Sequence, residues 1–399
     1  MNKNTLALSL LTTAILSAPS AFAADPAYAK GISDALADSK TNISFRARYE
    51  GVGQDGKDDA DALTVRSRFT VNTGAYQNFS LGLEVDNITA LVDDYNDLGT
   101  NYIGNEAVIA DAEVTDVNQA FIKYTNGDLS VKAGRQRINH DSQRFIGGVG
   151  WRQNEQTYDG YRFEYNANDK LNLDYTYVYN VNRIFGPDSK VAGDLAGNLH
   201  LLNGGFKFNK DHNIKAFAYL LDFDTAAAFS TNTYGFLYKG NVGGVKLLAS
   251  YATQSDTGDN LIDYTADYYN LEAATKLGSV TLKAGVEMQG SDNGVAFKTP
   301  LATLHAWNGF ADVFLNTPAD GLEDIYVTAV TKVKGVKLVA TYHDFSSDVN
   351  GIDYGSEIDL VAAYTVNKNY SLLAKYANYS ADSFSKDTDK VWLMLTAKF

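Results

Sequence analysis

The sequence predicts an all-β protein: a transmembrane, antiparallel, up-and-down β-barrel of about 18 strands. Three observations favour this fold. Apolar and polar residues alternate with a period of two from end to end, short and long connections alternate between these segments, and the composition combines 26 Tyr with only 5 Pro. A period of two is typical of β-strands, and alternating turns and loops are typical of outer-membrane barrels.

The N-terminal segment has the pattern of a secretory signal peptide. Lys3 is followed by an apolar stretch at residues 6–16, which is too short to cross a bilayer, and an A-x-A cleavage site ends at Ala23. We therefore expect export to the bacterial outer membrane. The expected domains are a cleaved signal peptide, a periplasmic lead that is either a short helix or disordered, and the barrel, over residues 1–23, 24–41 and 42–399.

The first predicted strand shows the alternation clearly. In ISFRARY, residues 43–49, Ile43 and Phe45 lie on one face while Arg46 and Arg48 lie on the other. The same pattern recurs in later segments at residues 245–251, 280–286, 336–342 and 370–376. These are weak repeats of one hairpin unit.

The last predicted strand follows the same pattern and ends on an aromatic residue. In VWLMLTAKF, Val391, Leu393 and Leu395 share one face, and Phe399 is the final residue. A strand with a terminal Phe resembles the assembly signal of outer-membrane barrels, so the barrel assembly machinery is an expected partner. The alternative is the ordinary last strand of a soluble sheet.

The connections alternate in length along the whole chain. Short turns are expected at residues 74–78, 125–128, 166–169, 209–212, 241–244, 277–279, 333–335 and 366–369. Longer polar connections are expected at residues 51–60, 88–113, 139–156, 182–199, 224–230, 255–262, 290–321, 346–354 and 381–388. The segments between them have about nine to twelve residues, which is the length of a tilted strand that crosses a bilayer.

The charges decide which face of each strand meets lipid. An Arg on the lipid face costs roughly 2–4 kcal/mol near the midplane, so the charged faces must border water inside the barrel. A barrel of this strand number is wide enough to leave an aqueous channel. Tyrosines at strand ends are expected to form interfacial girdles, at Tyr49, Tyr161, Tyr179, Tyr251 and Tyr342.

Composition argues against several other functions. The formal net charge of −14 disfavours nucleic acid as a partner, and the absence of Cys leaves no thiolate chemistry. His140, Asp141 and Ser142 are consecutive, whereas a catalytic triad needs groups that converge from separate positions. We expect no enzymatic activity, no cofactor and no metal. The acidic segment 53–62 is either a solvated loop or a site of divalent bridging to lipopolysaccharide.

The arginines all lie in the first half of the chain, between Arg46 and Arg183. Arg46 and Arg66 should lie close together if the first two strands pair across their connecting loop. Like charges directly opposite destabilise a sheet unless carboxylates are interleaved or an anionic ligand completes the site. Candidate lumenal carboxylates are Glu50, Glu84, Asp86 and Glu164. Two interpretations remain open: a salt-bridge network that stiffens the wall, and a cationic track that attracts anions.

The Gly-rich connection at residues 139–156 is predicted to lean over or into the pore and to form part of its narrowest point. Trp151 beside cations is a candidate for stacking on a sugar ring; an ordinary surface loop packed by this Trp is the alternative. The predicted pore-lining, anion-binding residues are Arg46, Arg48, Arg66, Arg68, Arg135, Arg137, Arg144, Arg152 and Arg162.

Three blocks carry a family resemblance: SFRARYE at 44–50, DALTVRSRFTVNTGAYQNFSLGLEVDN at 61–87, and GRQRINHDSQRFIGGVGWRQNEQTYDG at 134–160. With these blocks the chain resembles the alginate-export family of outer-membrane porins, specifically over about residues 45–165 and in architecture beyond. The resemblance implies an 18-stranded barrel with an electropositive lumen that passes anionic polysaccharide or smaller acidic solutes. It also implies that eight of the predicted arginines, all except Arg162, match the arginines of those blocks. The second half departs from the pattern, because its interior cations are lysines, at Lys246, Lys283, Lys337 and Lys375.

The predicted function is a cofactor-free outer-membrane channel for passive diffusion of anionic solutes, such as acidic sugars or uronate oligosaccharides. A weakly selective general porin and a loop-based adhesin or receptor with little conductance are the alternatives. Expected partners are outer-membrane lipid, lipopolysaccharide and small anionic solutes or acidic oligosaccharides.

Overall fold

The computed structural model describes residues 26–101, 104–189 and 193–399. The predicted signal peptide and its cleavage site near Ala23 lie outside the described residues. A short helix, α2 (Pro26–Ala37), precedes the first strand. Within the described ranges, no helix is both long and apolar enough to span a membrane.

The strands form one closed antiparallel sheet of 18 strands, as the sequence predicts. β1 pairs with β2 on one side and with β20 on the other, so the sheet has no free edge. The strands of the wall are β1 (Lys40–Gln54), β2 (Ala60–Asn72), β3 (Phe79–Asp94), β4 (Val114–Asn126), β5 (Leu129–Gln136), β6 (Thr157–Ala167), β7 (Leu171–Asn182), β8 (Asp194–Lys207), β9 (His212–Phe223), β10 (Thr231–Val242), β11 (Val245–Asp256), β12 (Thr265–Leu277), β13 (Val280–Gln289), β16 (Leu322–Val333), β17 (Val336–Ser346), β18 (Asp353–Thr365), β19 (Tyr370–Ala381) and β20 (Thr388–Lys398).

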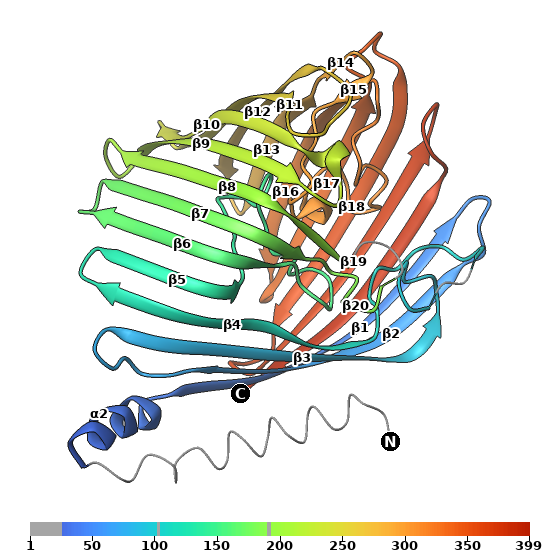
Figure 1. Ribbon diagram of the computed structural model, residues 1–399. Coiled ribbons are helices and arrows are strands. Elements are labelled where there is room, and N and C mark those ends of the chain that lie inside the picture. The colour runs from blue at the N-terminus through green and yellow to red at the C-terminus, as the bar shows by residue number, and fades with distance from the viewer. Residues whose placement is uncertain (1–25, 102–103, 190–192) are drawn as a thin grey trace.

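The short turns, helix α2 and the C-terminus lie at one end of the barrel (Figure 1). The backbone N–H of Gly74, in the β2–β3 turn, donates to the carbonyl of Ala35 in α2 at 2.8 Å, and the N–H of Ile43 donates to the carbonyl of Phe399 at 3.0 Å. The long connections lie at the opposite end, which is the extracellular end in barrels of this type.

The two faces of each strand separate as the alternation predicts. On β1, Ile43 and Phe45 are exposed on the outer surface, whereas Arg46 and Arg48 are buried inside the barrel. Four of the five tyrosines predicted to form girdles are exposed on the outer surface, namely Tyr161, Tyr179, Tyr251 and Tyr342. The outer surface is therefore apolar with an aromatic component, and the charged side chains of β1 face inward.

Two long connections fold into the barrel instead of projecting from it. We name them the first inward loop, residues 137–156, and the second inward loop, residues 290–321, which contains the short hairpin β14 (Ser291–Asp292) and β15 (Val295–Ala296) and the 3-10 turn η3 (Leu304–Ala306). Ile146 and Leu301 form a parallel bridge between them. A Cβ on Gly147 would lie 2.3 Å from the Thr303 hydroxyl oxygen, which explains the need for glycine there.

The largest hydrophobic core lies inside the barrel, where these loops meet the wall. Ile146 of the first inward loop and Phe297 and Leu301 of the second pack with Tyr158 of β6 and Leu199 of β8, and all five are almost fully buried. A second 3-10 turn, η2 (Ala227–Phe229), lies beside this core through the partly buried Phe229. The loops are therefore fixed parts of the interior.

Candidate functional site

Four arginines on the first two strands form what we call the arginine wall. Arg46 and Arg48 on β1 and Arg66 and Arg68 on β2 lie on the inner face of the barrel, and each is at most 9% exposed. Arg46 lies directly opposite Arg66 in the antiparallel register, as the sequence predicts. Two like charges in this arrangement repel each other, so acceptors must be supplied from elsewhere.

Carboxylates are the main acceptors for two residues of the arginine wall, Arg68 and Arg48. Arg68 binds Asp86 of β3 through two parallel hydrogen bonds of 2.7 and 2.5 Å. Arg48 forms an ion pair with Asp111, in the β3–β4 connection, and lies 3.5 Å from a Glu50 oxygen. Bidentate pairs of this kind fix the guanidinium plane as well as its charge.

Arg46 is satisfied in a different way, by the first inward loop. Its guanidinium donates to the Gln153 side-chain oxygen at 2.8 Å, to the Gly150 carbonyl at 3.0 Å, and to the Arg152 carbonyl. Its partner across the strands, Arg66, has only long contacts of 3.3–3.4 Å, with the Gln153 carbonyl and with Glu155. The first inward loop therefore supplies the acceptors of this arginine pair.

The first inward loop also carries its own charges to the wall. Arg152 binds Glu50 at 3.0 Å and Asp312 of the second inward loop at 3.1 Å. Glu155 accepts from Arg68 at 2.9 Å and forms an ion pair with Arg137. Burial acts to raise the pKa of Glu155, but the charges of Arg68 and Arg137 outweigh burial and lower its pKa to about 2.

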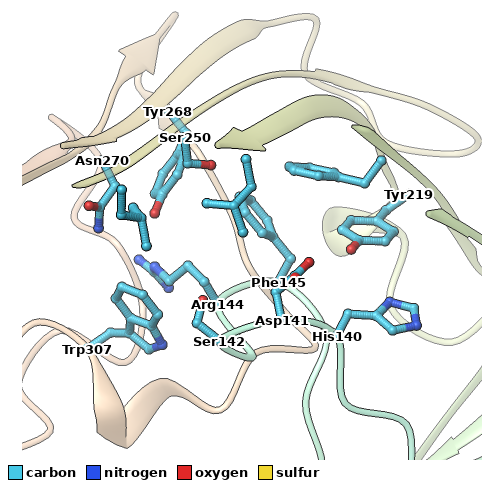
Figure 2. A pocket seen from close by; sticks show the side chains of 13 residues that line it. His140, Asp141, Ser142, Arg144, Phe145, Tyr219, Ser250, Tyr268, Asn270 and Trp307 are labelled. Carbon is cyan, nitrogen blue, oxygen red and sulfur yellow. The ribbon is translucent and has the colours of Figure 1, made fainter. Parts of the chain in front are cut away.

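Arg144 anchors the same loop on the far side of the barrel. Its guanidinium lies between the rings of Tyr268 and Trp307 (Figure 2), 5.8 and 5.3 Å from their centroids. It donates to Glu287 of β13 at 2.6 Å and to the Thr299 hydroxyl at 3.0 Å. The loop therefore crosses the lumen from β1–β2 to β13, which agrees with the prediction that it enters the pore.

The remaining inward-facing predicted residues also form ion pairs. Arg137 donates to Glu84 at 2.7 Å, and Arg162 binds Asp174 at 2.9 Å and Glu164 at 3.0 Å. Every carboxylate predicted to lie in the lumen pairs with an arginine, namely Glu50, Glu84, Asp86 and Glu164. Of the two interpretations left open by the sequence, the salt-bridge network thus describes most of the inward-facing arginines.

Arg135 does not line the lumen, so this part of the prediction is wrong. It lies opposite Asp159 of β6, and its Nε donates to that carboxylate at 2.9 Å. Asp159 shares the outer face of β6 with the exposed Tyr161. The spacing of two between Arg135 and Arg137 does not fix a common face because β5 ends at Gln136, and the chain turns inward only beyond that residue.

Trp151 is not free to stack on a sugar, which corrects a second prediction. Its ring stacks on His305 of the second inward loop, with centroids 4.4 Å apart and planes 6° from parallel. Its neighbour Trp392 of β20 meets it edge-on at 5.8 Å. Trp151 instead joins the two inward loops to the wall.

A group of buried carboxylates on β13, β16 and β18 was not predicted from the sequence. We name this group the acidic wall; it consists of Glu287, Asp324, Glu357 and Asp359, each 1% exposed. Two of them bind the backbone of the second inward loop: Ala311 N–H donates to Glu357 at 2.7 Å and Phe310 N–H to Asp359 at 3.2 Å. The spacing of two between Glu357 and Asp359 on β18 is the same signal that revealed the arginine pairs.

A cavity of about 470 Å³ lies at the long-loop end, above the inward loops. Its lining is mostly apolar, and includes Val149, Leu304 and Val313 from those loops. Arg152 and Lys390 also line it, and both bind Asp312 at 3.1 Å. The cavity thus combines apolar sides with cations that already share one carboxylate.

His140, Asp141 and Ser142 do not form a catalytic group. His140 contacts Asn203 at 2.9 Å, while Asp141 binds Lys215 at 2.5 Å, and the two side chains diverge (Figure 2). Among the described residues, no group of three or more His, Cys, Asp or Glu side chains is arranged to hold a metal ion.

Comparison with known proteins agrees with this architecture. Residues 40–181 match the sequence profile of the alginate export family. That region includes the arginine wall and the first inward loop, so the resemblance inferred from the sequence is confirmed there. A search of curated proteins gave no significant match.

Solved structures with the same fold cover nearly the whole chain. Pseudomonas aeruginosa OccK3 (OpdO) has a TM-score of 0.72 at 13% identity, covering 94% of this chain and 99% of its own. Acinetobacter baumannii OccAB4 gives 0.71 at 12%, covering 91% and 98%, and Pseudomonas aeruginosa OpdK with vanillate gives 0.71 at 18%, covering 91% and 99%. These likenesses show the fold of the chain, a closed antiparallel β-barrel, and the family match adds a sequence likeness over residues 40–181.

Proposed function

We propose that this protein is a passive outer-membrane channel for small anionic solutes. The observation that supports the proposal most directly is the Arg46–Arg66 pair, whose charges face each other across two strands. Arg46 has loop carbonyls and a glutamine oxygen as its acceptors, with no carboxylate within ion-pair distance among the described contacts. A solute carboxylate offers the same acceptor geometry with a full negative charge.

Entry would begin in the cavity at the long-loop end. Arg152 and Lys390 raise the local concentration of anions there, since cations in a low-dielectric cleft steer charged solutes. Below it, a solute carboxylate can replace the loop carbonyls on Arg46, so that exchange between acceptors moves the solute past the loop. The arginine fork binds both oxygens of a carboxylate, which favours carboxylates over chloride.

The apolar lining of the cavity favours acids with an apolar body. Val149, Leu304 and Val313 offer little to the hydroxyls of a sugar. The solved OpdK structure holds vanillate, an aromatic carboxylate, in a barrel of the same fold. We therefore rank small organic acids before acidic sugars and uronate oligosaccharides. Lipopolysaccharide contact and assembly through β20, which leads to Phe399, belong to the same proposal.

Planar-bilayer recording tests the charge selectivity. In a salt gradient the native channel should show an anion-selective reversal potential, and an Arg46→Gln/Arg66→Gln double variant should lose most of it. Arg135→Gln removes the same kind of charge from the outer face and should leave the reversal potential unchanged. Cation selectivity of the native channel would contradict the proposal.

A weakly selective general porin is the second candidate, because carboxylates pair with most lumenal arginines. A reversal potential near zero that neither variant changes would favour this candidate. Uronate oligomers and vanillate should then block the current equally weakly, whereas the first candidate predicts stronger block by vanillate.

A further inference from the structure

Lys375 of β19 lies in a cage of aromatic rings inside the barrel. Its ammonium lies 3.1 Å from the centroid of Phe310, 4.2 Å from Trp151 and 5.2 Å from Trp392. The residue is 6% exposed. Ammonium groups bind aromatic faces electrostatically, and the attraction grows when water is excluded.

A hydrogen-bond relay holds the same ammonium. Lys375 Nζ lies 2.7 Å from His305 Nε2, and His305 Nδ1 lies 2.7 Å from an Asp312 oxygen. Because an ammonium only donates, Nε2 must accept and Nδ1 must carry the proton that it donates to Asp312. Burial lowers the pKa of His305 to about 3, which keeps this neutral tautomer at neutral pH.

The cage is a second point where both inward loops meet the wall, apart from the hydrophobic core. Trp151 comes from the first inward loop, while His305, Phe310 and Asp312 come from the second. Lys375 therefore contacts both loops at once.

We propose that Lys375 ties both inward loops to β19, in addition to their other anchors, and that its positive charge sets how far the channel is closed at this point. This inference rests on the proposed channel function. Lys375 lies outside residues 40–181. By this inference it controls the first inward loop, which the arginine wall binds. A solute anion that competes for Lys375 would release both loops together.

Charge reversal separates this role from simple packing. In Lys375→Glu the aromatic faces repel the carboxylate, Asp312 and Asp359 lie near it, and both loops should separate from β19. Lys375→Arg keeps the cation and should restore closure. Lys283→Glu is a matched control, because Lys283 also lies over a ring, Tyr326 at 5.0 Å, and pairs with wall residue Glu272 at 2.9 Å.

Closure can be measured without any transport. The sequence has no Cys, so Ala311→Cys, at a position 3% exposed, introduces a unique thiol beside Phe310. A desolvated cation–π contact contributes about 2 kcal/mol, and 1.4 kcal/mol is a factor of ten, so Lys375→Glu should raise the rate of thiol labelling by about tenfold or more. Labelling should stay at the native rate in Lys375→Arg and Lys283→Glu.

Conductance is then recorded in planar bilayers with the same set of variants. Lys375→Glu should show a larger open-channel current and more frequent transitions, and Lys375→Arg should resemble the native protein. Unchanged labelling in Lys375→Glu would overturn the inference. Faster labelling without any ionic current would support the role of Lys375 in holding the loops and would refute only the channel function.

If Lys375→Glu does not fold, Phe310→Leu tests the same aromatic cage without a charge reversal in the wall. Phe310 belongs to the second inward loop and not to the wall, so the barrel can assemble without its ring. Labelling of Ala311→Cys should rise in this variant as well, by less than in Lys375→Glu. Native labelling rates in folded Phe310→Leu would count against the aromatic cage as the device that closes the loops.

Discussion

The arginine wall holds the first inward loop through backbone carbonyl groups, whereas the acidic wall holds the second inward loop through backbone N–H groups. Arg46 and Arg48 bind carbonyl oxygens of the first inward loop, at Gly150, Arg152 and Trp151. Glu357 and Asp359 bind N–H groups of the second inward loop, at Ala311 and Phe310. The arginine wall, with its positive charge, therefore binds backbone carbonyl groups, and the acidic wall binds backbone N–H groups. These particular contacts do not depend on the identity of the loop side chain.

The two walls differ in how their charges are balanced. The arginine wall alternates with carboxylates such as Asp86. In the acidic wall, Arg144 pairs with Glu287, and Asp324 lies 2.9 Å from the His343 ring. Glu357 has one carboxylate oxygen with no hydrogen-bond partner. The arginine wall is thus largely paired, and the acidic wall is less fully paired.

Removing Arg152 should have the largest effect, because this residue joins β1 to the second inward loop. Arg152→Ala leaves Glu50 with Arg48 at 3.5 Å and Asp312 with Lys390 at 3.1 Å, and breaking one partner of a buried pair costs up to about 3–5 kcal/mol. Urea unfolding in detergent micelles, followed by heat-dependent gel mobility, should show this loss. Arg152→Lys should recover part of it, and a loss below 1 kcal/mol in Arg152→Ala would contradict a connecting role.

Neutralising the acidic wall should have a smaller effect on stability and a clear effect on selectivity. Glu287→Gln keeps an acceptor for Arg144 but removes the charge, and a hydrogen bond to a charged group is worth about 1.5–3 kcal/mol against about 1 for a neutral one. The reversal potential should shift toward anions. Glu164→Gln, which alters a more exposed carboxylate paired with Arg162, should shift it less.

Acid should loosen the second inward loop before it affects the first. The pKa of His305 is about 3 in the closed state because of burial, against about 6.5 when the loop is released, so the released state binds an extra proton between these values. Closure is therefore fully stable above pH 6.5 and weakens as the pH falls toward 3. Glu155, whose pKa is about 2, adds its own loss only below about pH 4.5.

Thiol labelling of Ala311→Cys as a function of pH measures this dependence. The rate should rise as the pH falls from 6.5 to 4.5, after correction for the thiolate fraction of an exposed reference thiol. His305→Gln can still accept from Lys375 and donate to Asp312, but it does not titrate, and its profile should be flat in this window. A slope that persists in His305→Gln would assign the effect to another group.

The barrel and the arginine wall are predictable from the sequence because both depend on local periodicity. Alternation with a period of two fixes the face of Arg46 and Arg66, and the loop between their strands fixes their register. The path of the second inward loop is not predictable in this way. Its anchors, Glu357 on β18 and Lys375 on β19, lie more than 40 residues away from the groups that they bind.

Trp151 and Arg135 show two limits of residue-type reasoning. In the sequence, a Trp among cations is compatible both with stacking on a sugar ring and with packing inside the protein. Only the position of His305 in the structure decides between these two roles. The alternation rule applies within a strand, so it fails where β5 ends between Arg135 and Arg137.

Replacing the outer-face ion pair should have the smallest effect. Arg135 and Asp159 are partly exposed, and such pairs contribute about 0–1 kcal/mol, so Arg135→Leu/Asp159→Leu should change the free energy of unfolding by no more than that. The reversal potential should stay at the native value, because neither charge borders the lumen. Asp159→Leu alone should be the worse variant, since it leaves Arg135 beside lipid with only the longer Asp116 contact of 3.6 Å, and an arginine there costs up to about 2–4 kcal/mol. Equal stability of the single and double variants, together with a loss of anion selectivity, would place Arg135 inside the barrel and restore the assignment made from its spacing.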